Sequence, residues 1–123
     1  MSTRPLIVFD VNETLLDLEA IEPIFERIFG EKGAMRLWFA NLILYSEALT
    51  VAGCYVPFND IGSAVMKMLA DTRAIKIDDG DKKELAHKFS TMPPHREVPA
   101  ALRKLRDAGF RLFTFTNNPI EVQ

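Results

Sequence analysis

The chain has 123 residues, a formal net charge of −2 at pH 7 and a single cysteine. A length of this order corresponds to one domain or to part of one. The small net charge provides no basic surface, so we expect no nucleic-acid partner and no membrane partner. One cysteine excludes an internal disulfide and no apolar run approaches the ~20 residues of a membrane helix, so we expect a cytoplasmic protein.

The residues Leu6, Ile7, Val8 and Phe9 form an apolar run that leads directly into Asp10. A run that is apolar at every position predicts a strand buried on both faces, as in a parallel sheet covered by helices. Asp10 would then lie at the carboxyl end of this strand, where open α/β sheets bind their ligands. A carboxylate at that place is a candidate nucleophile or metal ligand, and an Asp that only opens a turn is the alternative.

Thr14 follows Asp10 by four residues in a short polar loop. At this spacing the hydroxyl and the backbone N–H of Thr14 can both hydrogen-bond the Asp10 carboxylate, which would keep it ionised and oriented. We therefore interpret Asp10 and Thr14 as a catalytic pair.

Two helices are expected directly after the Asp10 loop. Residues 21–28 carry apolar side chains at helical spacing, and Gly30 and Gly33 end this pattern. Residues 35–51 are apolar around much of the helical circumference. We expect such a helix either to be buried between layers of secondary structure or to form the surface that contacts a binding partner.

Two further helices are indicated by capping signals. Asn59 or Asp60 can cap a third helix, and Asp81 with Glu84 makes a capping box for a fourth.

A proline-rich linker at residues 92–95 ends the helical series. A last helix follows, with Pro99 in its first turn and Gly109 after its end, and residues 110–115 form a second apolar strand. This order is a strand–helix–strand crossover interrupted by about 75 residues, far more than a usual connection. We expect a core made of 1–17 and 96–123, with 18–95 inserted after the first strand as a lid over the crevice.

The second strand ends in Thr116 and Asn117. The Thr116 hydroxyl, the Asn117 amide and nearby backbone N–H groups can donate hydrogen bonds to a carboxylate or phosphate oxygen. An ordinary turn is the alternative, because the sequence continues as Asn118-Pro119. The presence of Asp10 at the end of a neighbouring strand favours a shared binding site.

These motifs resemble those of the haloacid dehalogenase-like hydrolases. The apolar strand, Asp10, Thr14-Leu15 and Asp17 resemble motif I, and the version FDVNETLLDL is most similar to the type II (L-2-)haloacid dehalogenases. Thr116 and Asn117 resemble motif II. The resemblance implies an α/β fold, namely the N-terminal part of a Rossmann-like core of parallel strands with an inserted four-helix cap.

The resemblance also implies a chemistry. Asp10 would be a nucleophile that forms a covalent ester and displaces halide from a small 2-haloacid, without a cofactor and without a metal. Thr14 would orient the nucleophile. The residues expected to contact the substrate are Val11, Asn12, Phe39, Thr116 and Asn117.

Asn12 bears on the choice between two hydrolase activities. Phosphatases of this superfamily typically carry a second Asp two residues after the nucleophile, and the amide of Asn12 cannot shuttle a proton. A leaving halide needs no proton, so Asn12 favours carbon–halogen displacement. A Mg²⁺-dependent phosphatase acting on a small phosphomonoester remains the alternative.

The sequence departs from the resembling enzymes in two ways. Phe39 stands where those enzymes usually present an arginine after an aromatic residue, and Arg36 lies three residues earlier. The sequence given also ends at Gln123 without a counterpart of the motif III lysine or the motif IV acids. We therefore expect these 123 residues to be incomplete and inactive alone, and a non-catalytic remnant that forms homo-oligomers, such as a dimer, through its cap helices is a further alternative.

Overall fold

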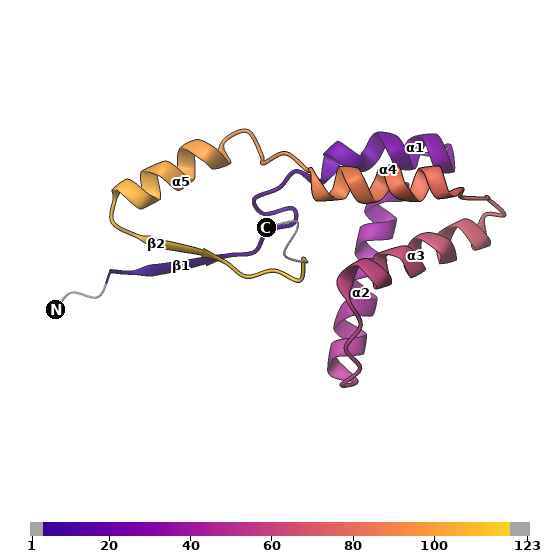
Figure 1. The fold of residues 1–123 in the computed structure, drawn as a ribbon, viewed down its shortest axis with the longest axis horizontal. Helices are drawn as coiled ribbons and strands as arrows, with labels where there is room; N and C mark the ends of the chain where they lie inside the picture. Colours follow the sequence, from indigo (N-terminus) through magenta and orange to yellow (C-terminus); the bar gives the residue numbers. More distant parts are fainter. Residues whose placement is uncertain (1–3, 119–123) are drawn as a thin grey trace. The chain divides into compact units, whose positions relative to one another are not determined.

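The computed structural model describes residues 4–118 of the chain. These residues form two compact units (Figure 1). The strand unit contains residues 4–19 and 92–116, and the helical unit contains residues 20–91 together with 117 and 118. Within residues 4–118 no helix combines the length and the hydropathy needed to cross a membrane.

The strand unit is built on two parallel strands, β1 (Leu6–Phe9) and β2 (Arg111–Thr114). Leu6 lies opposite Arg111 and Phe9 lies opposite Thr114. The helix α5 (Val98–Asp107) precedes β2 and packs against it (Figure 1). The predicted crossover of strand, helix and parallel strand is therefore confirmed.

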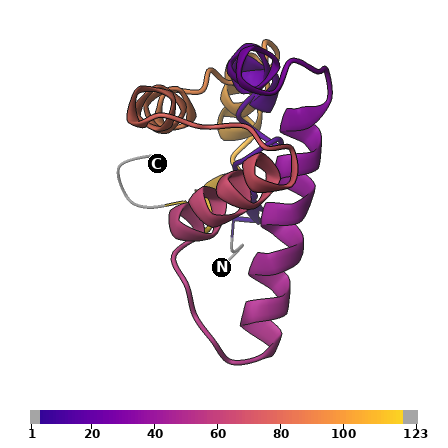
Figure 2. The ribbon, with the colours of Figure 1, turned by 90° about the vertical axis from the view of Figure 1, so that its right-hand side faces the viewer.

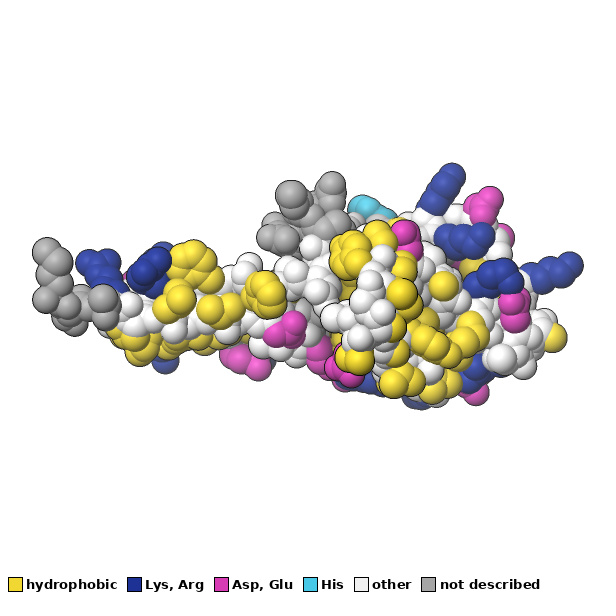
Figure 3. Space-filling view, turned by 90° about the horizontal axis from the view of Figure 1, so that it is seen from below, with side chains coloured by type: hydrophobic (Ala, Val, Ile, Leu, Met, Phe, Trp, Pro, Cys, Tyr) yellow, Lys and Arg dark blue, Asp and Glu magenta, His cyan; other side chains and the backbone are white. Residues whose placement is uncertain are grey.

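The prediction that β1 is buried on both faces is wrong for the part of the chain that the structure describes. Leu6 and Val8 are 53% and 54% exposed, and Phe113, opposite Val8, is 50% exposed. Successive residues of a strand point to opposite faces, so these side chains share the face that α5 leaves open. Figure 3 views this unit from the side away from α5 and shows hydrophobic side chains along the strands. Burial on both faces needs helices on both sides, and α5 packs against one side of the strands.

The helical unit contains the four predicted helices. Their bounds are α1 (Glu22–Phe29), α2 (Ala34–Val51), α3 (Phe58–Thr72) and α4 (Asp79–Ser90), and a short 3-10 helix (Leu18–Ile21) precedes α1. The helix α2 packs against α1 and α3, and α4 packs against α1 (Figure 2). Gly30 ends α1 in the left-handed conformation, with a φ of 69°, which glycine adopts without strain.

Aromatic side chains form the centre of the helical unit. The ring of Trp38 on α2 lies 5.1 Å from that of Phe25 on α1 and contacts Phe89 on α4 edge-on at 6.1 Å. The indole N–H of Trp38 donates a 2.9 Å hydrogen bond to the carbonyl of Gly62 on α3. One buried side chain thus joins all four helices through its contacts, and Trp38 is a core residue. The other buried apolar residues around it include Phe29, Met35, Leu42, Ile61, Val65 and Leu69.

The caps of α3 and α4 differ from those predicted. Pro57 precedes α3, so Asn59 and Asp60 lie inside the helix and do not cap it. The capping box of α4 is formed by Asp78 and Asp81, three residues before the predicted one. A capping box needs only a polar acceptor followed three residues later by a second one, and the sequence offers this pattern twice.

Glu84, the predicted second member of the capping box of α4, forms an ion pair instead. Its carboxylate lies 2.6 Å from the guanidinium of Arg27 on α1, and Asp81 lies 2.8 Å from the same group. The hydrogen bond that Arg27 donates to Asp81, with the negative charge of Glu84, raises the pKa of Arg27 above its ordinary value. These ion pairs connect α1 with α4 at an exposed surface.

Candidate active site

Asp10 and Thr14 lie in contact directly after β1. The Thr14 hydroxyl donates a 2.7 Å hydrogen bond to Oδ2 of Asp10, as predicted. The Thr14 backbone N–H does not reach the carboxylate, because it donates to the carbonyl of Val11 at 3.3 Å. Both side chains are exposed, and Oδ1 of Asp10 accepts no hydrogen bond from a described residue. The carboxylate is therefore oriented through one oxygen and accessible through the other.

The loop after Asp10 is held by its own backbone. The carbonyl of Val11 accepts hydrogen bonds from the N–H groups of Thr14, Leu15 and Leu16 at 3.3, 2.9 and 3.0 Å. Val11 is buried and Asn12 is half-buried. This bonding fixes the position of Thr14 beneath Asp10, while the predicted substrate contacts of Val11 and Asn12 stay predictions.

Thr116 lies at the same edge of the sheet as Asp10. The N–H of Phe115 donates a 2.8 Å hydrogen bond to the carbonyl of Phe9, so the two strands stay paired up to the residues before Asp10 and Thr116. The carboxyl ends of parallel strands meet at one edge, and the half-buried Thr116 therefore lies at the same edge as Asp10. Its role as a substrate ligand stays a prediction.

Two predicted substrate residues belong to the helical unit. Asn117 is exposed, and Phe39 on α2 is half-buried with its ring 6.3 Å from that of Trp38. Arg36 is exposed on the same helix. The structure describes these residues within their own unit, and their part in a site with Asp10 stays a prediction.

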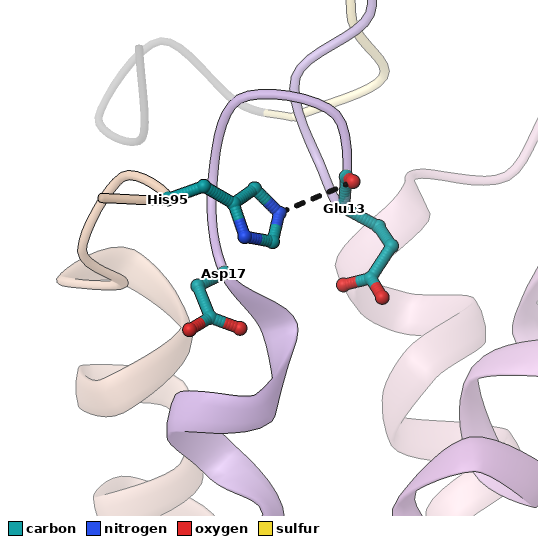
Figure 4. Close-up of side chains that lie close together, drawn as sticks. All are labelled: Glu13, Asp17 and His95. Atoms are coloured by element: carbon teal, nitrogen blue, oxygen red, sulfur yellow. Dashed lines mark hydrogen bonds between the residues drawn. The ribbon is translucent and has the colours of Figure 1, made fainter. Parts of the chain in front are cut away.

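One cluster of polar side chains was missed by the sequence analysis. Glu13, Asp17 and His95 are half-buried, and their possible metal-binding atoms lie within 4.8 Å of one another (Figure 4). Two carboxylates and an imidazole can bind Zn²⁺ or another divalent cation. Their proximity has no signal in the sequence, because His95 lies 82 residues after Glu13.

Backbone pairing brings His95 to this loop. The N–H of Asp17 donates to the carbonyl of Pro93 at 2.8 Å, and the N–H of His95 donates to the carbonyl of Leu15 at 2.9 Å. The Nε2 atom of His95 lies 3.3 Å from the carbonyl of Glu13. A carbonyl only accepts, so Nε2 carries the proton in this contact. The linker thus supports the loop that holds Asp10 and Thr14.

Comparison with known sequences finds dehalogenases. No protein-family model matches the chain. The haloacetate dehalogenase H-2 of Moraxella sp. (strain B) is 26% identical over 117 residues, which cover 94% of this chain and 52% of that protein. An (S)-2-haloacid dehalogenase of Pseudomonas fluorescens is 24% identical over 112 residues, which cover 89% of this chain and 49% of that protein. The chain thus spans about half the length of the curated relatives it matches.

Comparison with solved structures finds the same fold. An L-2-haloacid dehalogenase superposes with a TM-score of 0.86 at 22% identity, over 99% of this chain and 56% of that one. The L-2-haloacid dehalogenase of Xanthobacter autotrophicus superposes with a TM-score of 0.83 at 19% identity, over 98% and 49%. The resemblance expected from Asp10 and Thr116 is confirmed: the chain has the α/β fold of the haloacid dehalogenase-like enzymes, and its sequence is similar to L-2-haloacid dehalogenases over about nine-tenths of its length.

Proposed function

We propose that this protein is a hydrolase of the haloacid dehalogenase type, with Asp10 as its nucleophile. The observation that carries the proposal is the hydrogen bond from Thr14 to Asp10 Oδ2 at the carboxyl end of β1. This arrangement leaves Oδ1 of an exposed carboxylate without a hydrogen bond among the described residues. The similarity to haloacetate and (S)-2-haloacid dehalogenases supports the same reaction class.

In the first step, Asp10 Oδ1 attacks the carbon that bears the halogen. A new bond between oxygen and carbon forms as the carbon–halogen bond breaks, and the halide leaves with the bonding electrons. The product is an ester between Asp10 and the remaining carboxylic acid. Thr14 has a positioning role, because its hydrogen bond fixes the direction of the carboxylate before the attack. A structure of the Xanthobacter autotrophicus enzyme contains covalently bound chloropropionic acid, which supports an ester of this kind.

In the second step, water attacks the ester carbonyl of Asp10. The bond between that carbonyl carbon and Oδ1, which is now bonded to the substrate carbon, breaks. A 2-hydroxyacid that carries Oδ1 leaves with release of a proton, and the oxygen of the water completes the free Asp10 carboxylate. We assign no residue of this chain to the activation of the water. Since the chain spans about half the length of its relatives, we propose that the 123 residues alone complete this step poorly or not at all.

We propose that the substrate carboxylate is bound at the edge of the sheet by Thr116 and Asn117, with the backbone N–H groups of Val11 and Asn12. Phe39 would line the site in place of the arginine that the resembling enzymes usually present. An arginine would donate two charge-assisted hydrogen bonds to the substrate carboxylate, and a phenyl ring donates none. Binding of simple 2-haloacids would therefore be weak.

The halide mechanism requires no metal and no cofactor. The phosphatase alternative requires Mg²⁺ and an acid that protonates the leaving alkoxide, and Asn12 is not such an acid. The relatives found by comparison are dehalogenases, and this similarity does not favour the phosphatase alternative.

We also propose that copies of the chain associate through the cap helices. Leu44, Tyr45 and Leu37 of α2 are 58%, 41% and 43% exposed. Exposed apolar residues at neighbouring helical positions form a surface that a second copy can cover. Concentration-dependent sizing of the chain and of a Leu44→Glu variant tests this, and identical monomeric behaviour of both would contradict it.

For localisation we propose the cytoplasm. Cys54 is exposed and is the single cysteine of these 123 residues. A lone exposed thiol is more compatible with a reducing compartment than with an oxidising one.

Halide release tests the activity. The longest natural polypeptide that contains these 123 residues is incubated with (S)-2-chloropropionate, with and without a chelator. We expect chloride release that the chelator does not change, and no release by the Asp10→Asn variant. Asp17→Asn is the matched control, because it removes a nearby carboxylate to which the proposed mechanism gives no role. Absence of release by wild type, or equal release by wild type and Asp10→Asn, would contradict the proposal.

A further inference from the structure

The helical unit contains a cavity of about 760 Å³ between α2, α3 and α4. This volume is within the range of small-molecule binding sites, roughly 300–1,000 Å³. Its walls are mainly apolar and include the rings of Trp38 on α2 and Phe89 on α4. Among the apolar lining residues, Trp38, Leu42 and Phe89 are buried, and Ile75, Ile77 and Leu85 are half-buried.

Positive charge predominates among the polar residues of the cavity. Lys67, Lys76 and Lys82 line it, and Asp71 is the one carboxylate among the lining residues. Two of these lysines are already paired: Lys67 with Asp71, one helical turn later, and Lys82 with Asp79 at 3.1 Å. Lys76 forms no ion pair with a described residue. The apolar pocket therefore has one exposed lysine at its border that forms no ion pair with a described residue.

We propose that this cavity binds an aliphatic carboxylate such as a fatty acid. The hydrocarbon chain would contact the half-buried Ile75, Ile77 and Leu85, and the carboxylate would pair with the exposed Lys76. The apolar contacts supply most of the binding free energy, because burial of hydrocarbon scales with the area removed from water. The single free lysine selects an anionic head group over a neutral one. The proposal is independent of the reaction at Asp10, because every lining residue belongs to the helical unit.

Trp38 provides the signal for the test. It is the only tryptophan of the chain and it lines the cavity, so a bound ligand changes the surroundings of the one indole fluorophore. The full 123-residue chain is titrated with dodecanoate below its critical micelle concentration, and with dodecanol as the neutral probe. We expect a saturable change with one site per chain and weaker binding of dodecanol.

Two variants locate the site. Lys76→Gln should weaken dodecanoate binding about two- to fivefold, the effect of one partly exposed ion pair, and leave dodecanol binding unchanged. Ala86→Phe fills the cavity from an exposed position on α4 and should weaken both ligands. Lys83→Gln is the matched control, because Lys83 is exposed on the same helix and does not line the cavity. Circular dichroism verifies that each variant is folded.

Three results would overturn the proposal. The first is the absence of a saturable change in Trp38 fluorescence. The second is a change that neither Lys76→Gln nor Ala86→Phe affects, which would place the ligand on another apolar surface. The third is competition between dodecanoate and self-association with no effect of Lys76→Gln, which would identify the cavity as a contact between copies.

Discussion

The hydroxyl of Thr14 donates a 2.7 Å hydrogen bond to Oδ2 of Asp10, four residues earlier in the chain. Removal of this donor should misorient the carboxylate and leave the fold intact, because both side chains are exposed. We expect Thr14→Val to lower kcat/KM for halide release by about 10- to 100-fold, since a hydrogen bond to a charged group contributes about 1.5–3 kcal/mol. Thr14→Ser keeps a hydroxyl and should retain most of the activity. Equal kcat/KM values for Thr14→Val and wild type would contradict the positioning role.

We propose that Phe39 lines the substrate site at the position where the resembling enzymes usually present an arginine. The Phe39→Arg variant should lower KM for (S)-2-chloropropionate by about tenfold or more, because the guanidinium donates charge-assisted hydrogen bonds to the substrate carboxylate. Phe39→Met keeps an apolar side chain of similar size and serves as the control. Steady-state kinetics on the two variants checks the prediction. A folded Phe39→Arg variant with the KM of Phe39→Met would show that this position does not face the substrate.

His95 supports the loop that carries Asp10. Its Nε2 atom lies 3.3 Å from the carbonyl of Glu13, and its backbone N–H donates to Leu15. His95→Ala should lower the free energy of unfolding of the strand unit by about 0.5–1.5 kcal/mol, the contribution of one hydrogen bond. Hydrogen exchange of the amides in residues 11–17 measures this change locally. His87→Ala removes an exposed imidazole and is the control; equal exchange rates in both variants would contradict a supporting role for His95.

Phe25 is a central core residue of the helical unit, with no exposed side-chain surface. We expect Phe25→Ala to lower the free energy of unfolding by about 3–5 kcal/mol, because it removes a large buried ring and leaves a cavity. Urea unfolding followed by Trp38 fluorescence measures this change in the free energy of unfolding, since the rings of Phe25 and Trp38 are 5.1 Å apart. Val51→Ala, at a position that is 89% exposed, should change stability by less than about 0.5 kcal/mol. A small effect of Phe25→Ala would mean that this ring does not stabilise the unit.

Local sequence patterns predicted most of the fold. The helices α1 and α2 and the stop at Gly30 follow from apolar spacing and glycine, which act over one or two turns. The hydrogen bond between Thr14 and Asp10 was also predicted, because its partners are four residues apart. The caps of α3 and α4 were wrong by two or three residues, since several acidic or amide side chains near each start satisfy the same capping rule.

Contacts between segments that lie far apart in the chain could not be predicted from the sequence. The pairing of Asp17 with Pro93, and the resulting proximity of His95 to Glu13, depends on how the linker returns to the loop. The exposure of Val8 and Phe113 depends on the number of helices that cover the sheet, and an apolar run does not report that number. The apolar pattern predicted the strand correctly and its burial wrongly.

Peptide mass mapping tests the central claim, that Asp10 is the nucleophile. The longest natural polypeptide that contains these residues is mixed with (S)-2-chloropropionate, quenched in acid during turnover and digested. We predict a mass increase equal to one ester-linked propionate on the peptide that contains Asp10, present in wild type and Asp17→Asn and absent in Asp10→Asn. Chloride release without a modified Asp10 peptide, or modification of another residue, would contradict the account.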